Sequence, residues 1–110
     1  MTDMIGKTVT VKIDRPLGSR HPNHKDMIYP LNYGFIEGVI APDGEEQDAY
    51  VLGVDVQISK FTGKIIAIIH RKNDVEDKWV VAPENVSFSK NEIEQAVKFQ
   101  EKYFEYEILM

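Results

Sequence analysis

The sequence predicts a small, mainly β domain of the α+β class, in which about five short strands form a closed or partly closed barrel and one helix follows. Strand-like segments occupy most of the chain, a helical period appears only near its end, and strands do not alternate with helices. The 110 residues are the usual length of one domain, so we expect a single domain over residues 1–110.

The first strands are predicted by alternation of apolar residues. Residues 8–14 place Val9, Val11 and Ile13 on one face, which is typical of a half-buried strand. Residues 33–40 and 49–54 are also strand-like and flank a polar turn, so we expect them to form a hairpin.

Two further strands are expected in the second half of the chain. A short turn is predicted at residues 62–63, and the apolar run 65–69 then predicts a strand buried on both faces. Residues 78–82 predict the last strand, which Pro83 ends.

The helix has the clearest local signal in the sequence. Ser89 and Glu92 have the spacing of a capping box, and Phe88 and Ile93 that of a hydrophobic staple. The face predicted to cover the barrel consists of Ile93, Ala96, Val97, Gln100 and Phe104.

Composition excludes several classes of function. A net charge of −5 argues against nucleic-acid binding, and the absence of cysteine excludes disulfides and thiolate zinc sites. The longest apolar runs, 65–69 and 79–83, are too short to cross a membrane, and the N-terminus does not resemble a signal peptide. We therefore expect a cytoplasmic protein with no membrane partner.

Two acidic segments are candidate metal sites. Residues 43–48 carry four acidic side chains directly after the turn signal at 41–44, and a second group contains Asp74, Glu76 and Asp77. Oxygen donors without thiolates favour Mg²⁺, with Mn²⁺ as the alternative, over zinc. Each segment alone is also compatible with a solvated surface turn.

Basic residues lie close to these acidic groups in the sequence. Arg15, Arg20, His21, His24 and Lys25 cluster before the second strand, and Lys78 follows the second acidic group. Metal-binding carboxylates beside anion-binding Arg and Lys are typical of phosphoryl chemistry. Arg20 is the strongest phosphate-binding candidate in this loop, although a merely solvated loop is the alternative.

Two motifs at a fixed spacing suggest a family. Residues 29–36 read Tyr-Pro-Leu-Asn-Tyr-Gly-Phe-Ile, and residues 43–48 read Asp-Gly-Glu-Glu-Gln-Asp. The pair resembles the signature of the family I soluble inorganic pyrophosphatases, Tyr-Pro-x-Asn-Tyr-Gly followed by Asp-Gly-Asp-Pro-x-Asp. Shorter similarities follow at residues 78–83 and 99–103.

The resemblance implies a five-stranded OB-like barrel that hydrolyses pyrophosphate to two phosphates with Mg²⁺. It implies metal binding by Asp43, Asp48, Asp74 and Glu76, a proton-accepting role for Glu45, a place beside the attacking water for Tyr33, and phosphate contacts for Lys78 and Tyr103. Asp77 is an alternative to Asp74 or Glu76 as a metal ligand, and the resemblance implies that Asp14 takes the place of an early metal-binding Glu of the family.

The chain departs from the family pattern at several positions. Glu45 replaces an Asp, Glu46 a Pro and Phe104 a Lys, and the stretch that carries a substrate Arg is missing before residue 29. One alternative is therefore a non-catalytic or weakly active homologue that binds a phosphorylated metabolite or Mg²⁺. Another is a hydrolase of a different phosphoanhydride or of a phosphomonoester.

The C-terminal residues are rich in apolar and aromatic side chains. They include Tyr103, Phe104, Tyr106, Ile108, Leu109 and Met110. An apolar surface of this kind is commonly buried against another subunit, so the sequence predicts a homo-oligomer.

Overall fold

The computed structural model describes residues 2–74 and 76–110. The elements along the chain are η1 (Thr2–Met4), β1 (Thr8–Arg15), β2 (Asn32–Ile40), β3 (Glu46–Val51), β4 (Lys60–Arg71), β5 (Asp77–Ala82), α1 (Lys90–Glu101) and β6 (Tyr106–Leu109). No helix in this part of the chain has both the length and the apolar character that crossing a bilayer requires.

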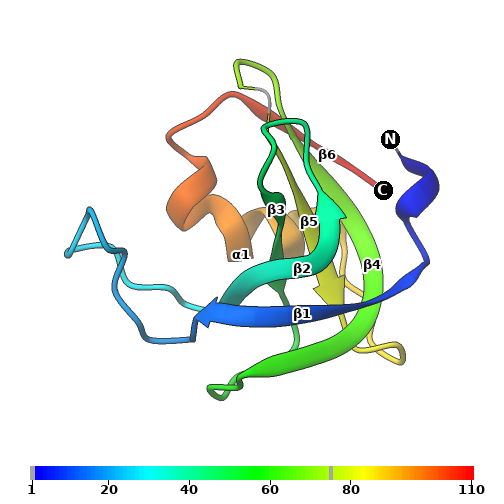
Figure 1. The fold of residues 1–110 in the computed structure, drawn as a ribbon, viewed down its shortest axis with the longest axis horizontal. Coiled ribbons are helices and arrows are strands. Elements are labelled where there is room, and N and C mark those ends of the chain that lie inside the picture. The colour runs from blue at the N-terminus through cyan, green and yellow to red at the C-terminus, as the bar shows by residue number, and fades with distance from the viewer. Residues whose placement is uncertain (1, 75) are drawn as a thin grey trace.

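Five strands close into a barrel, as the sequence predicts. They pair in the order β1-β2-β3-β5-β4, and β4 pairs with β1 to close the sheet (Figure 1). β4 is long enough to pair with β1 through residues 60–64 and with β6 through residues 68–71. α1 packs beside the barrel, and the 16–31 loop projects from the end of β1 (Figure 1).

The central strands contribute to two hydrophobic clusters because successive side chains point to opposite faces. In β4, Ala67 and Ile69 belong to one cluster, which also contains the helix residues Ile93 and Val97, whereas Ile65 and Ile68 belong to the other. A register shift between Ile65 and Ala67 allows Ile65 and Ile68, three residues apart, to share a cluster. This arrangement confirms the prediction that the 65–69 strand is buried on both faces.

Gly34 marks a close approach between β1 and β2. A Cβ atom at this position would lie 1.8 Å from the carbonyl oxygen of Lys12, so no other residue fits without moving the backbone. The glycine therefore allows β2 to pass directly against β1 at the point where the sheet bends into the barrel.

The start of α1 is also as predicted. The Ser89 side chain accepts a hydrogen bond from the Glu92 amide at 3.1 Å, and the Glu92 side chain accepts one from the Ser89 amide at 2.8 Å. The buried face of the helix differs from the prediction, because its fully buried members are Ile93, Val97 and Glu101. Phe104 lies beyond the end of α1.

Two other predictions about elements are wrong. Residues 62–63 do not form a turn, because β4 runs through them and pairs with β1 there. Residues 77–82 are not the last strand, because β6 follows the helix and pairs with β4.

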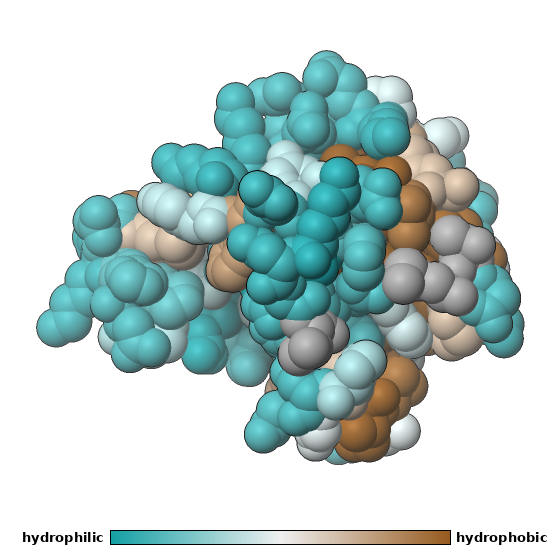
Figure 2. Space-filling model, turned by 90° about the horizontal axis from the view of Figure 1, so that it is seen from above, coloured by the Kyte–Doolittle hydropathy of each residue, from teal (hydrophilic) through white to brown (hydrophobic). Residues whose placement is uncertain are grey.

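The apolar C-terminus is partly covered within the chain. Ile108 in β6 is buried against the barrel, whereas Tyr103 and Met110 remain more than half exposed. Figure 2 shows a mostly hydrophilic face on which hydrophobic residues form small patches. The homo-oligomer therefore stays a prediction, with less apolar surface to support it than the sequence indicates.

Candidate functional site

The parallel pairing of β3 with β5 brings the two acidic turns to the same end of the barrel. The turn at residues 41–45 leads into β3, and a turn at residues 72–74 precedes β5. Because Ala49 pairs with Trp79 in a parallel register, the preceding residues, Asp48 and Lys78, are also neighbours.

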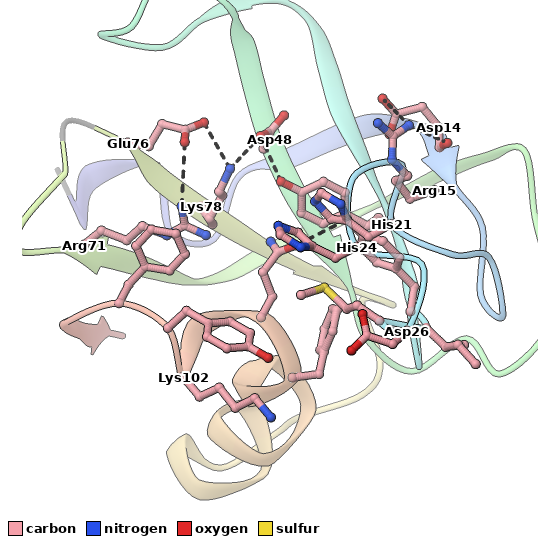
Figure 3. A pocket seen from close by; sticks show the side chains of 18 residues that line it. Asp14, Arg15, His21, His24, Asp26, Asp48, Arg71, Glu76, Lys78 and Lys102 are labelled. Atoms are coloured by element: carbon pink, nitrogen blue, oxygen red, sulfur yellow. Dashed lines mark hydrogen bonds and ion pairs between the residues drawn. The ribbon is translucent and has the colours of Figure 1, made fainter.

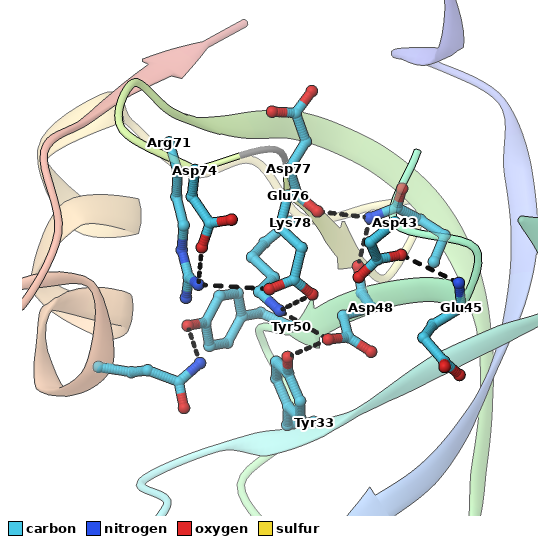
Figure 4. Close-up of polar contacts among 12 residues, drawn as sticks. Tyr33, Asp43, Glu45, Asp48, Tyr50, Arg71, Asp74, Glu76, Asp77 and Lys78 are labelled. Atoms are coloured by element: carbon cyan, nitrogen blue, oxygen red, sulfur yellow. Dashed lines mark hydrogen bonds and ion pairs between the residues drawn. The ribbon is translucent and has the colours of Figure 1, made fainter. Parts of the chain in front are cut away.

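Lys78 lies between two carboxylates (Figure 4). Its Nζ is 2.6 Å from Asp48 Oδ2 and 3.0 Å from Glu76 Oε1. Glu76 immediately precedes β5, and its side chain reaches the Lys78 side chain two residues further on. The hydroxyl of Tyr33 donates a second hydrogen bond to Asp48 Oδ2 at 2.8 Å. We call Asp48, Glu76 and Lys78 the Lys78 cluster.

A buried ion pair lies next to this cluster. Arg71 donates two hydrogen bonds to Glu101, at 2.9 Å from Nε and 2.7 Å from Nη2, and both side chains are almost completely buried. The Tyr50 hydroxyl donates to the same carboxylate at 2.6 Å. The remaining nitrogen of Arg71, Nη1, lies 3.7 Å from Glu76 Oε2, and the Phe104 ring centre is 3.7 Å from the guanidinium carbon.

These surroundings fix the charge state of several side chains. Burial, and then the charge of Asp48, raise the pKa of Tyr33 well above its usual value, so Tyr33 stays a neutral donor at pH 7. Burial also raises the pKa of Asp14, and the charge of Asp48 adds to this effect while Arg15 opposes it. Burial works to lower the pKa of Arg71, but its hydrogen bonds to Glu101 and the charge of Glu101 raise it overall, so Arg71 stays charged.

The Lys78 cluster and Arg71 line a pocket of about 910 Å³ (Figure 3). The pocket lies between the barrel, the 16–31 loop and the C-terminal end of α1. The lining residues that carry charge or a titratable ring nitrogen are Asp14, Arg15, His21, His24, Asp26, Asp48, Arg71, Glu76, Lys78 and Lys102. The pocket therefore offers cations and carboxylates side by side.

Five of the predicted site residues line this pocket. They are Tyr33, Asp48, Glu76, Lys78 and Tyr103. The structure thus brings together residues from β2, β3, β5 and the segment after α1, which the sequence motifs group by spacing alone.

The other predicted site residues are not among the described residues that line the pocket. Asp43 accepts a hydrogen bond from the Glu45 amide at 3.0 Å in the exposed turn before β3, and both side chains lie to one side of the Lys78 cluster in Figure 4. Asp74 Oδ2 is 3.8 Å from Arg71 Nη1. Arg20 donates to the Lys25 carbonyl at 2.7 Å within its own loop.

Sequence reasoning missed the buried pair of Arg71 and Glu101. Glu101 stands four residues after Val97 and eight after Ile93, so a carboxylate on an otherwise apolar helix face was the available signal. An arginine two residues after the apolar run 65–69 was the corresponding signal in β4. Neither signal reveals that the two residues meet.

The described residues contain no preformed group of metal ligands. Over residues 2–74 and 76–110, no group of three or more His, Asp or Glu side chains is close enough to hold a metal. In addition, Lys78 already occupies the space between Asp48 and Glu76. The predicted metal-binding roles of Asp43, Asp48, Asp74 and Glu76 remain predictions.

Comparison with solved structures identifies the fold. The chain superposes on the inorganic pyrophosphatase of Ehrlichia chaffeensis with a TM-score of 0.71 and 18% identity, covering 96% of this chain and 86% of that one. For the Helicobacter pylori inorganic pyrophosphatase the TM-score is 0.63, with 17% identity and coverage of 96% and 84%. This chain has the inorganic pyrophosphatase fold.

A third example shows the same relation at slightly higher identity. The inorganic pyrophosphatase of Neisseria gonorrhoeae gives a TM-score of 0.60 with 21% identity, covering 94% of this chain and 76% of that one. No protein-family model and no curated protein matches the sequence. The likeness therefore concerns the fold.

Proposed function

We propose that this protein hydrolyses phosphoanhydride bonds and that inorganic pyrophosphate is its simplest substrate. The observation that carries the proposal is the Lys78 cluster, in which one ammonium group lies between two carboxylates in a large pocket. The likeness of the barrel to solved inorganic pyrophosphatases supports the same reaction class.

Three cations in the pocket are suited to phosphate oxygens. Arg71 and Lys78 are almost fully buried, and Arg15 lies on the opposite wall at the end of β1. Charge–charge interactions are stronger in such a partly enclosed site than in water. We propose that these cations hold the substrate and stabilise the negative charge that develops on the phosphoryl oxygens.

Two carboxylates are suited to proton transfer. Asp48 uses Oδ2 for both Tyr33 and Lys78, which orients its other oxygen, Oδ1. We propose Asp48 as the acceptor of the proton from the attacking water, because it lines the pocket whereas Glu45 lies in the exposed turn. The second is Asp14, which lines the pocket at the end of β1.

We propose that Mg²⁺ enters together with the substrate. Magnesium in phosphate-processing sites is usually held by one or two carboxylates plus substrate phosphates, rather than by a cage of protein ligands. A magnesium–pyrophosphate complex would need only one or two carboxylate oxygens from the protein, which Asp48 and Glu76 could supply. It would need no preformed group of three protein ligands. Mn²⁺ satisfies the same oxygen donors and is expected to replace Mg²⁺.

Phosphate release from pyrophosphate tests this proposal. We expect turnover with Mg²⁺, none with excess EDTA, and a loss of at least about tenfold in Glu76→Gln because the neutral amide no longer balances the cations. The matched control is Glu37→Gln, since Glu37 is exposed and pairs with Lys12 away from the pocket. Equal activity of the two variants would contradict the proposed site.

A second candidate is a binding protein without turnover. The observation that favours it is that Lys78 bonds to one oxygen of each nearby carboxylate, which leaves fewer oxygens for a metal. Calorimetry with pyrophosphate in magnesium buffer separates the two candidates. Tight binding with no phosphate release from any phosphoanhydride would favour the binding protein.

A further inference from the structure

The pocket is larger than bare pyrophosphate requires. Its volume of about 910 Å³ is near the upper end of the ~300–1,000 Å³ range typical of sites for drug-sized ligands. Pyrophosphate is much smaller than such a ligand and would occupy only the end of the pocket at the Lys78 cluster and Arg71. The rest of the pocket has room for an organic group attached to the phosphates.

A series of aromatic rings leads from the charged end of the pocket to the 16–31 loop. The ring centres of Tyr33 and Tyr29 are 5.6 Å apart, those of Tyr29 and His21 are 6.2 Å apart with an interplanar angle of 5°, and those of His21 and His24 are 5.0 Å apart. All four rings line the pocket. Tyr33 also bonds to Asp48, so the series begins at the Lys78 cluster.

Apolar side chains in the same region are unusually exposed. Ile28 is 49% exposed and Tyr103 is 65% exposed, and both line the pocket, one from the 16–31 loop and one from the segment after α1. Figure 3 draws His21 and His24 in the middle of the pocket, with Asp48 and Lys78 on one side and Lys102 on the other. The part of the pocket beyond the Lys78 cluster is therefore suited to a flat aromatic group.

The neutral state of His21 also favours binding of a flat aromatic group. Partial burial, and then the charges of His24 and Arg15, lower the pKa of His21, so its ring is neutral at pH 7. A neutral imidazole stacked parallel to Tyr29 offers an aromatic face without an added charge.

We propose that the physiological substrate is a nucleoside polyphosphate, of which a nucleoside diphosphate is the simplest. Its phosphates would lie at the Lys78 cluster and Arg71, and its base against His21, His24 and Tyr103. This inference rests on the proposed function, because the phosphates occupy the same cluster. Aromatic side chains bind bases of every kind, since each base has a π-face.

Hydrolysis of a nucleoside diphosphate breaks the same kind of bond as hydrolysis of pyrophosphate and also consumes one water molecule. Water attacks the terminal phosphorus, and the bond from that phosphorus to the bridging oxygen breaks. The bridging oxygen remains on the nucleoside monophosphate, and orthophosphate and a proton are released. No oxidant, reductant or other co-reactant is needed.

Calorimetry with methylene-bridged diphosphates, which cannot be hydrolysed at the bridge, tests the inference without requiring turnover. Methylenediphosphonate is compared in magnesium buffer with the α,β-methylene diphosphates of adenosine, guanosine, cytidine and uridine. We expect at least one nucleoside analogue to bind tenfold or more tightly than methylenediphosphonate.

The possible failures are distinguishable. If methylenediphosphonate binds and none of the four nucleoside analogues binds more tightly, this inference is wrong and the proposed function stands. If none of the five compounds binds, both are wrong.

Two substitutions locate the base. His21→Ala should lose most of the advantage of the nucleoside analogue over methylenediphosphonate, whereas the matched control His70→Ala should keep it, because His70 pairs with Asp77 and does not line the pocket. Tyr103→Ser, at an exposed position beyond α1, provides a second variant that spares the core. An undiminished advantage in both pocket variants would overturn the inference.

Discussion

Lys78 is the residue on which most of the proposed chemistry depends. Its side chain is nearly buried, and its charge is balanced by Asp48 and Glu76. A buried charge is tolerated only when it is paired and hydrogen-bonded, so these carboxylates and the ammonium group hold one another in place. The sequence analysis singled out all three residues, Asp48 and Lys78 from segments similar to the family motifs and Glu76 from the second acidic group.

Glu101 provides a stability prediction for the buried ion pair. Glu101→Leu leaves the Arg71 guanidinium buried without its main partner, so we expect a loss of about 3–5 kcal/mol in the free energy of unfolding. Chemical denaturation measures this loss. The control Glu107→Leu alters an exposed residue of β6 and should change stability by less than about 0.5 kcal/mol. A cost below about 1 kcal/mol for Glu101→Leu would mean that the ion pair is not formed in solution.

Asp14 provides a pH-dependent prediction. Because its pKa is raised in the folded state, ionising Asp14 costs the folded protein more than the unfolded chain, and stability falls as pH rises through that pKa. Asp14→Asn should therefore be more stable than wild type at pH 7, by less than about 1 kcal/mol because the side chain is partly exposed. The advantage should vanish near pH 3.5, where both states are mostly protonated. Urea unfolding at the two pH values is the measurement, and an advantage that grows toward low pH would contradict this account.

Among the elements, α1 was predicted most accurately because its signals are local. The capping box depends on residues three apart, so the sequence alone determines it. β6 was missed for the opposite reason. Residues 106–109 form a strand only because β4 extends past the barrel and offers an unpaired edge, which is a long-range property.

The capping box gives a prediction for the helix. Ser89→Ala removes the side chain that accepts the Glu92 amide, so we expect the protein to lose about 1 kcal/mol of stability. Thermal or chemical unfolding measures the change. Ser87→Ala, also at an exposed position but before the cap, should behave like wild type. Equal stability of the two variants would show that the cap contributes nothing.

For the molecule as a whole, the barrel and its covering helix were predictable from strand number and from the late onset of the helical period. The pocket was predictable only in part. Parallel pairing of β3 and β5 unites Asp48 with Lys78, and no local pattern specifies that pairing. Arg71, Glu101 and the aromatic series ending at His24 belong to segments far apart in the sequence, so their meeting follows from the closed fold.

The incorrect prediction of a turn at residues 62–63 also has a long-range cause. Thr-Gly is a common turn signal, but Gly63 is buried in β4, where a Cβ would lie 2.4 Å from the Ala82 carbonyl oxygen. The glycine is needed for the close approach of two strands. Gly63 is therefore explained by the packing of two strands in the folded barrel, and not by the turn that its local sequence predicts.

The most direct test of the central claim, that the Lys78 cluster is a phosphoanhydride hydrolysis site, is the turnover number of Asp48→Ala on magnesium pyrophosphate. Asp55→Ala, which alters an exposed aspartate outside the pocket lining, is the matched control. We expect the turnover number to fall at least about 10²-fold in Asp48→Ala and to stay near normal in Asp55→Ala. An Asp48→Ala enzyme that retains most of the wild-type rate would contradict it.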